Sequence, residues 1–98
     1  MKSIIDTPEE YRLRILAEEC AELAQAALKM IRAKEHDTPI TEDDAIENLI
    51  EECADVMVGI RSVLNEMQLE GMTAICVLKQ IRWEQRLNDA KVLQDCQG

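Results

Sequence analysis

Apolar residues recur at alternating steps of four and three along the first third of the chain. The series consists of Leu16, Cys20, Leu23, Ala27 and Met30. This spacing puts the side chains on one face of an α-helix. A start signal precedes it, with Thr7 as N-cap, Pro8 at the first helical position and Glu10 at the capping-box position. We expect a helix from this signal to about Lys34, followed by a polar connection.

A second apolar series follows with the same spacing. Its members are Ile46, Leu49, Cys53, Val56, Ile60, Val63 and Met67. Thr41 is the N-cap candidate, and the acidic first turn after it suits the positive end of a helix dipole. The pattern predicts a helix to about Leu69, with Gly71 as the stop signal. A third helix is predicted from about Thr73 into the last ten residues, with Ile75, Leu78 and Ile81 on its buried side.

These patterns predict an all-α fold and no strands. The expected architecture is an antiparallel helical bundle of three main helices, or four, within a single domain over residues 1–98. Three helices of this kind leave apolar faces that a second copy of the chain could cover. We therefore expect a homodimer or homotetramer.

An acidic pentad occurs twice. Glu18-Glu19-Cys20-Ala21-Glu22 returns as Glu51-Glu52-Cys53-Ala54-Asp55, once in each of the two predicted long helices. Residues three apart share a helix face, so Glu19 pairs with Glu22, and Glu52 pairs with Asp55. Because the chain reverses between the helices, the two pairs can face each other.

Carboxylates held this close repel one another. At an effective dielectric constant near 20, two of them ~5 Å apart cost roughly 3 kcal/mol. A divalent cation would remove that cost, and carboxylate oxygens suit Mg²⁺ or Mn²⁺ better than zinc. The expected primary ligands are Glu19, Glu22, Glu52 and Asp55; Glu18 and Glu51 would bind a second metal ion or orient a water molecule, which makes them the candidate catalytic acids.

Two different interpretations of the acids compete with a magnesium site. The first is an ordinary charged helix surface, with lysine or arginine partners four residues further on. The second is a di-iron carboxylate bundle, which requires Glu-x-x-His elements. The only histidine, His36, lies in the connection far from both pentads, so the di-iron interpretation is disfavoured.

The formal net charge of −9 argues against a nucleic-acid polymer as the main partner. No apolar run is long enough to span a membrane. The four cysteines form neither a CxxC motif nor a Cys/His group, and no secretory signal precedes them. We expect Cys20, Cys53, Cys76 and Cys96 to be reduced thiols in a cytoplasmic protein, mostly small core fillers.

A basic stripe follows in the third predicted helix. Lys79, Arg82 and Arg86 share one side of the helix, and Trp83 lies beside them. The stripe is equally consistent with phosphate binding and with a solvated surface. Trp83 is either a core or interface residue or a platform for a nucleobase.

The combination resembles the all-α nucleoside triphosphate pyrophosphohydrolase group, the MazG-like superfamily. The resemblance covers roughly residues 9 to 88. Its signature, EExxE on one helix and ExxD on the next, is matched by Glu18-Glu19-x-x-Glu22 and Glu52-x-x-Asp55. Lys79 and Arg82 stand where the group carries basic residues on a following helix.

This resemblance implies a Mg²⁺-dependent cleavage of a nucleoside triphosphate to the monophosphate and pyrophosphate. Lys79, Arg82, Arg86 and Trp83 are then the candidate substrate-binding residues. The Ile15-Leu16-Ala17 lead-in and the Val56–Gly59 segment depart from the phosphoribosyl-ATP pyrophosphatase pattern, so that activity is the less favoured reaction. A non-catalytic helical oligomerisation or regulatory module, and a protein that binds nucleotides without hydrolysing them, also fit the sequence.

Overall fold

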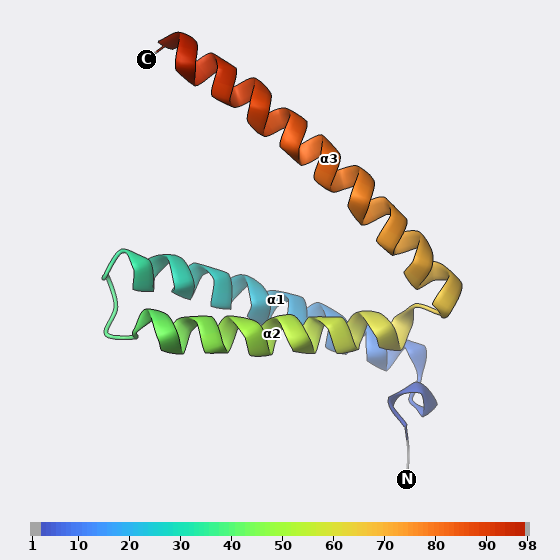
Figure 1. Cartoon of the computed structure of the whole chain (residues 1–98). Helices are drawn as coiled ribbons and strands as arrows, with labels where there is room; N and C mark the ends of the chain where they lie inside the picture. Colours follow the sequence, from blue (N-terminus) through green and yellow to red (C-terminus); the bar gives the residue numbers. More distant parts are fainter. Residues whose placement is uncertain (1–2, 98) are drawn as a thin grey trace. The chain divides into compact units, whose positions relative to one another are not determined.

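The chain is all-helical, as predicted. A computed structural model describes the backbone of residues 3–97 and the side chains of residues 3–90. A short 3₁₀ helix, η1 (Ile4–Asp6), precedes α1 (Glu9–Lys34), α2 (Glu42–Val63) and α3 (Glu66–Gln97), and the described residues contain no strand (Figure 1). The chain divides into two compact units, one ending at Leu64 and one beginning at Asn65.

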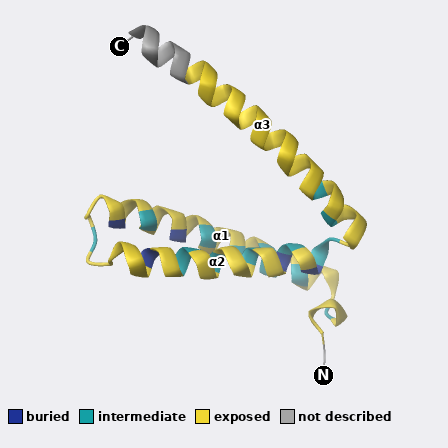
Figure 2. Cartoon of the chain, viewed as in Figure 1, coloured by how far each residue is buried: buried dark blue, intermediate teal, exposed yellow. Residues whose placement is uncertain are grey.

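The first unit is an antiparallel hairpin of α1 and α2, which lie side by side (Figure 1). Small residues form the closest part of the seam between them: Ala26, Ala33, Ala45 and Gly59 are buried, and Ser62 is 7% exposed. A methyl group added to Gly59 would meet Leu16 Cδ1 at 3.0 Å. Small side chains therefore set how closely the two helices approach, and the buried positions follow their facing sides (Figure 2).

The α1 seam is offset by one residue from part of the predicted apolar stripe. Leu16, Leu23 and Met30 are half-buried as expected, but Cys20 and Ala27 are exposed. Their places in the seam are taken by the residues directly before them, Glu19 and Ala26, which are half-buried and buried. On α2, Leu49, Val56, Ile60 and Val63 are half-buried as predicted, whereas Ile46 and Cys53 are exposed. Met67, which was predicted in the same helix, is exposed and lies in α3.

The cysteines differ from the prediction in burial. Cys20, Cys53 and Cys76 are free thiols, as expected, but all three are exposed and none fills a core position. For Cys20 and Cys53 the reason is the one-residue offset of the seam. The side chain of Cys96 lies outside the described residues.

The start of α1 also departs from the prediction. Pro8, not Thr7, is the N-cap residue, and it makes no side-chain capping hydrogen bond. The Thr7 hydroxyl instead donates to the carbonyl oxygen of Ile4 over 2.6 Å, because Thr7 ends the preceding 3₁₀ helix. That short helix has its own capping box between Ser3 and Asp6, which the apolar pattern does not reveal.

The turn between α1 and α2 has well-defined ends. His36 adopts a left-handed conformation with φ of 60°, while His36 N–H donates to Ala33 and Asp37 N–H donates to Arg32. This is a Schellman arrangement, which ends α1 near the predicted Lys34. Thr41 caps α2 as predicted, since its hydroxyl oxygen accepts from Asp44 N–H over 3.1 Å.

Arg12 joins the two helices at the open end of the hairpin. Its Nε donates to the carbonyl oxygen of Thr7 over 3.3 Å, and its Nη1 donates to the carbonyl oxygen of Ser62. Carbonyl groups in the last turn of a helix have no partner within the helix. Arg12 therefore satisfies one of these groups in α2 and ties it to the beginning of α1.

α2 ends six residues earlier than predicted, and Gly71 is not a stop signal. Leu64 and Asn65 separate α2 from α3, and Gly71 lies inside α3 with open space where its Cβ would be. Asn65 and Gln68 form a reciprocal cap: Gln68 N–H donates to Asn65 Oδ1 over 2.8 Å, and Asn65 N–H donates to Gln68 Oε1 over 2.9 Å. This pair starts a new helix where the apolar stripe alone suggested continuation.

The second unit is the single helix α3. A lone helix cannot bury a face, and Ile75, Leu78 and Ile81, which we expected on its buried side, are exposed, Leu78 by 63%. Apolar side chains lie on more than one side of this helix, since Trp83 and Leu87 are exposed as well. Among the described residues, no helix combines the length and apolar character needed to cross a membrane.

Candidate metal centre

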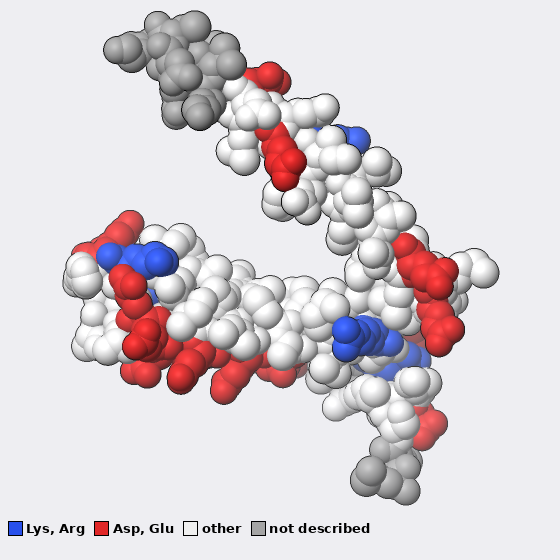
Figure 3. Space-filling view, viewed as in Figure 1, with Lys and Arg blue, Asp and Glu red and all other residues white. Residues whose placement is uncertain are grey.

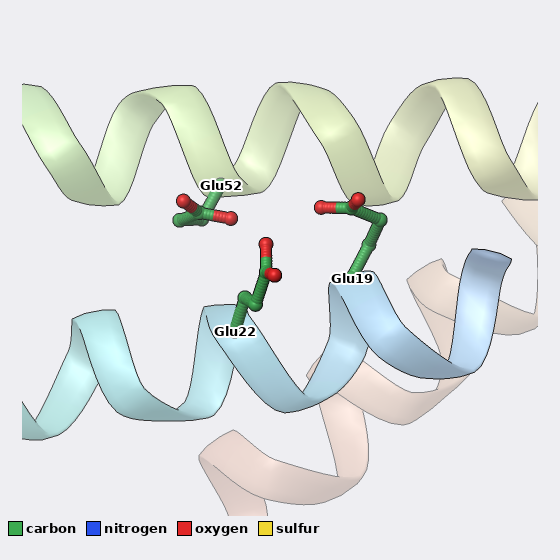
Figure 4. Close-up of side chains that lie close together, drawn as sticks. All are labelled: Glu19, Glu22 and Glu52. Carbon is green, nitrogen blue, oxygen red and sulfur yellow. The ribbon is translucent and has the colours of Figure 1, made fainter.

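Three carboxylates meet in the seam of the hairpin. Glu19 and Glu22 come from α1, and Glu52 comes from α2. One carboxylate oxygen from each lies within 4.8 Å of those of the other two. Figure 4 shows the side chain of Glu22 directed from α1 toward α2, with its carboxylate between those of Glu19 and Glu52. Both copies of the repeated pentad therefore contribute to one group, and all three members belong to the predicted ligand set.

The helices bring these acids together through the offset of the seam. Glu19 and Glu52 occupy half-buried seam positions. Each has a half-buried apolar residue one turn before it and another one turn after it. On α1 these are Leu16 and Leu23, and on α2 they are Leu49 and Val56. Glu22 lies one turn after Glu19 and is exposed. The group is therefore open to solvent on the side of Glu22 and closed by apolar side chains along the seam.

Two oxygens of this group are buried without a partner. Glu19 Oε2 and Glu52 Oε2 each expose less than 1 Å² and accept no hydrogen bond. A buried carboxylate oxygen without a donor is costly, because it has lost water and gained nothing in exchange. Cation binding is one arrangement that would supply the missing partner.

No basic side chain compensates these acids within the described part of the chain. The one ion pair found there joins Arg14 to Glu10 at 2.9 Å. The positions four residues after Glu19, Glu22 and Glu52 hold apolar residues, namely Leu23, Ala26 and Val56. These three acids therefore do not form a charged surface with basic partners four residues further on.

Burial and, after it, mutual repulsion change the proton affinities of two of these acids. Burial raises the pKa of Glu19 above the ordinary glutamate value of 4.5, and the negative charges of Glu22, Asp55 and Glu52 raise it further. Burial also raises the pKa of Glu52, followed by the charges of Glu22, Asp55 and Glu51. Either residue, once protonated, can donate a hydrogen bond to Glu22, which favours the neutral form.

The remaining predicted acids lie around this group. Asp55 is exposed and falls outside the three-residue cluster, although its charge acts on both Glu19 and Glu52. Glu18 and Glu51 are exposed, and each precedes a seam glutamate by one residue, which turns it away from the seam by about 100°. The structure thus brings together three of the four predicted ligands.

The predicted substrate-binding residues belong to the other unit. Lys79, Arg82, Arg86 and Trp83 all lie on α3 and are exposed. The three basic residues share one side of this helix, as their spacing predicted. The hairpin and α3 are separate units, so the acidic group consists of residues of α1 and α2 alone.

The acidic group fits a hard divalent cation. All of its donors are carboxylate oxygens, two of which lack any partner, and they come from two helices fixed by the same seam. Mg²⁺ and Mn²⁺ prefer such donors, and Mg²⁺ usually keeps several waters beside one or two carboxylates. Glu22, the exposed member, gives the group access to solvent.

Comparison with known proteins gives no relative. No model of a protein family, no curated protein and no solved structure matches this chain.

Proposed function

We propose that the protein is a Mg²⁺- or Mn²⁺-dependent nucleotide pyrophosphohydrolase that converts a nucleoside triphosphate to the monophosphate and pyrophosphate. The observation that carries the proposal is the convergence of Glu19, Glu22 and Glu52, with two of their oxygens buried and unpartnered. The MazG-like resemblance of the two pentads suggests the reaction, and the three converging carboxylates support a site for its cation.

In this proposal Glu19, Glu22 and Glu52 hold the cation, and Asp55 joins them as the fourth carboxylate. A bound cation supplies neutralisation of phosphate charge and activation of an attacking water. Glu18 and Glu51, exposed beside the group, accept a proton from that water or orient it. Lys79, Arg82 and Arg86 bind phosphate oxygens electrostatically, and Trp83 contacts the nucleobase.

The raised pKa values of Glu19 and Glu52 support the proposed cation site. A site that leaves Glu19 and Glu52 with raised pKa values destabilises its own charged form, which a cation reverses. Cation binding should consequently lower the pKa of both residues and release protons at any pH at which either is still protonated.

A pyrophosphate-release assay with canonical and modified nucleoside triphosphates tests the function. The wild-type protein should turn over at least one of them with Mg²⁺, and a Glu22→Ala/Asp55→Ala variant should be inactive. Glu47→Gln, which changes an exposed acid elsewhere on α2, should keep full activity. Turnover by the double variant equal to that of the wild type would refute the proposed site.

A thermal-shift titration separates the three classes of function. A ligand that binds only the native state raises stability by about 2.7 kcal/mol at a hundredfold excess over its Kd. An enzyme shows this response to cation and nucleotide and also forms product. A binder without activity shows the response alone, and an oligomerisation or regulatory module shows neither.

A further inference from the structure

One polar side of the hairpin changes its charge along α1. A row of exposed residues lies beside the seam there, and each member directly precedes a seam residue, as Glu22 precedes Leu23 and Lys29 precedes Met30. We call it the α1 polar row. Its members recur at alternating steps of four and three and are Glu18, Glu22, Gln25, Lys29 and Arg32. The row therefore begins with two acids at the proposed metal centre and ends with two basic residues.

Helix α2 contributes a second row to the same side of the hairpin. Its members also precede seam residues and are Asp44, Asn48, Glu51 and Asp55. A residue one position before a seam residue is turned about 100° away from the seam. Because α1 and α2 are antiparallel, this rotation carries both rows to the same side (Figure 1). Figure 3 shows Asp and Glu side chains gathered along one edge of the hairpin, with Lys and Arg side chains only near its two ends in this view.

Two carboxamides separate the acidic group from the basic residues. The contact between Glu22 and Glu52 fixes the register of the two helices. Gln25 lies three residues after Glu22, and Asn48 lies four residues before Glu52, so both stand at the same level of the antiparallel hairpin. This level is about one turn from the acidic group, on the side of the connection between the helices. Lys29 follows one turn further along α1.

Lys29 is placed to reach back toward the acidic group. It lies seven residues after Glu22, about 10.5 Å along the helix axis. The Cα–Cβ bonds of an α-helix tilt toward its N-terminus, which for Lys29 is the direction of Gln25 and Glu22. A chain of phosphates that starts at a cation on Glu22 and runs along the polar row therefore approaches the ammonium group of Lys29.

The two basic residues do not neutralise the acids of the hairpin. Within residues 3–90, neither Lys29 nor Arg32 takes part in an ion pair. Charge pairs that stabilise a helix place Glu and Lys four residues apart, but Gln25 occupies the position four before Lys29. Arg32 lies in the last turn of α1, where the helix dipole favours a cation, whereas Lys29 lies before that turn. Helix stability therefore does not account for Lys29.

We propose an anion subsite that binds the two phosphates leaving as pyrophosphate and consists of Gln25, Lys29, Arg32 and Asn48. The inference rests on the proposed function, because the cation at the acidic group would hold the other end of the same phosphate chain. Lys29 and Arg32 supply positive charge, and the two carboxamides supply N–H donors without adding charge. All four residues belong to the same unit as the acidic group, so the hairpin alone carries both contacts to the phosphates.

Inorganic pyrophosphate tests the subsite separately from catalysis. Isothermal titration calorimetry of the full chain at constant excess Mg²⁺ gives the Kd of magnesium pyrophosphate. Lys29→Gln should raise this Kd at least about 10-fold, because it removes a charge-assisted hydrogen bond to phosphate. Lys29→Arg, which keeps the charge, should retain most of the affinity. Both variants should bind Mn²⁺ alone as the wild type does.

Lys34 provides the matched control on the same helix. It is exposed and directly follows the seam residue Ala33, so it lies on the other side of the hairpin from Lys29. Lys34→Gln should leave the Kd of magnesium pyrophosphate unchanged. Equal affinities for Lys29→Gln and Lys34→Gln, in a protein that binds the cation and hydrolyses nucleotides, would overturn the subsite and leave the proposed function intact. No binding of magnesium pyrophosphate by the wild type would also overturn the subsite, and no binding of Mn²⁺ would overturn the metal centre together with it.

Discussion

The helices of the hairpin and α3 are stabilised by different contacts. The hairpin brings two helices together through small buried residues, and this close packing positions three acids that repel one another. α3 has a reciprocal cap at Asn65 and Gln68 but, taken by itself, no packed face. The comparison shows that the repelling acids lie in the unit whose two helices pack against each other, and none of them lies on the helix that by itself has no packed face.

The largest expected difference between the two units is in catalysis. Glu52→Gln removes a carboxylate from the proposed metal centre and should lower kcat at least about 100-fold, since even partners of metal ligands cost 10–100-fold. Arg82→Ala on α3 removes a proposed phosphate contact and should mainly raise KM. Steady-state kinetics with the substrate found in the nucleotide panel distinguishes the two. A normal kcat for Glu52→Gln would show that the acidic group of the hairpin takes no part in the reaction.

Glycine substitutions test the packing of each unit. Gly59→Val inserts side-chain atoms against Leu16, already 3.0 Å from an added Cβ, and should cost about 1–3 kcal/mol of unfolding free energy. Gly71→Ala enters open space on α3 and should stabilise the protein by about 1 kcal/mol through helix propensity. Urea denaturation measures both. The two changes in unfolding free energy should have opposite signs, and changes of the same sign would contradict the difference in packing between the two units.

The cap at the start of α3 should make a smaller contribution. Asn65→Ala removes the side-chain acceptor for Gln68 N–H and should cost about 1 kcal/mol. Its effect should appear as faster amide hydrogen exchange in the first turns of α3, with little change in the hairpin. Equal acceleration in α1 and α2 would show that the two units unfold together.

Substitution of Glu19 should have the smallest effect on stability, and this effect should be a stabilisation. Its pKa is raised in the folded protein, mainly by burial, so the folded state binds more protons than the unfolded state above pH 4.5. Stability without metal should therefore fall as pH rises through the interval from this value to the raised pKa. Glu19→Gln should flatten this dependence and raise the melting temperature at pH 7 by a few degrees, while abolishing the response to Mg²⁺. Melting curves at several pH values with EDTA test this; a lower melting temperature for the variant would contradict it.

Sequence periodicity predicted the helices better than their boundaries and faces. The apolar stripe continues through Val63 to Met67 in the same register, so spacing could not reveal the break at Leu64 and Asn65. The usable signal was the Asn65-x-x-Gln68 cap. In α1, two possible stripes share Leu16, Leu23 and Met30 and differ by one residue at the positions between them, and hydrophobicity favoured Cys20 and Ala27. Packing instead selected the neighbouring stripe with Glu19 and Ala26.

The acidic group was more predictable than the core around it. The repeated pentads identified Glu19, Glu22 and Glu52 from sequence, because a duplicated spacing on antiparallel helices can meet in only a few ways. The outlying position of Asp55 could not be predicted in the same way, since it depends on how far the hairpin helices rotate about the seam. The substrate-binding residues on α3 stay a prediction.

Direct measurement of cation binding tests the central claim that Glu19, Glu22 and Glu52 form a metal centre. Mn²⁺ can be titrated into the metal-free protein while its electron paramagnetic resonance signal reports the free ion. The wild type and Glu47→Gln should bind Mn²⁺ stoichiometrically per chain, and Glu22→Gln should bind it at least about 100-fold more weakly. Equal binding by the Glu22→Gln variant, or none by the wild type, would contradict the account.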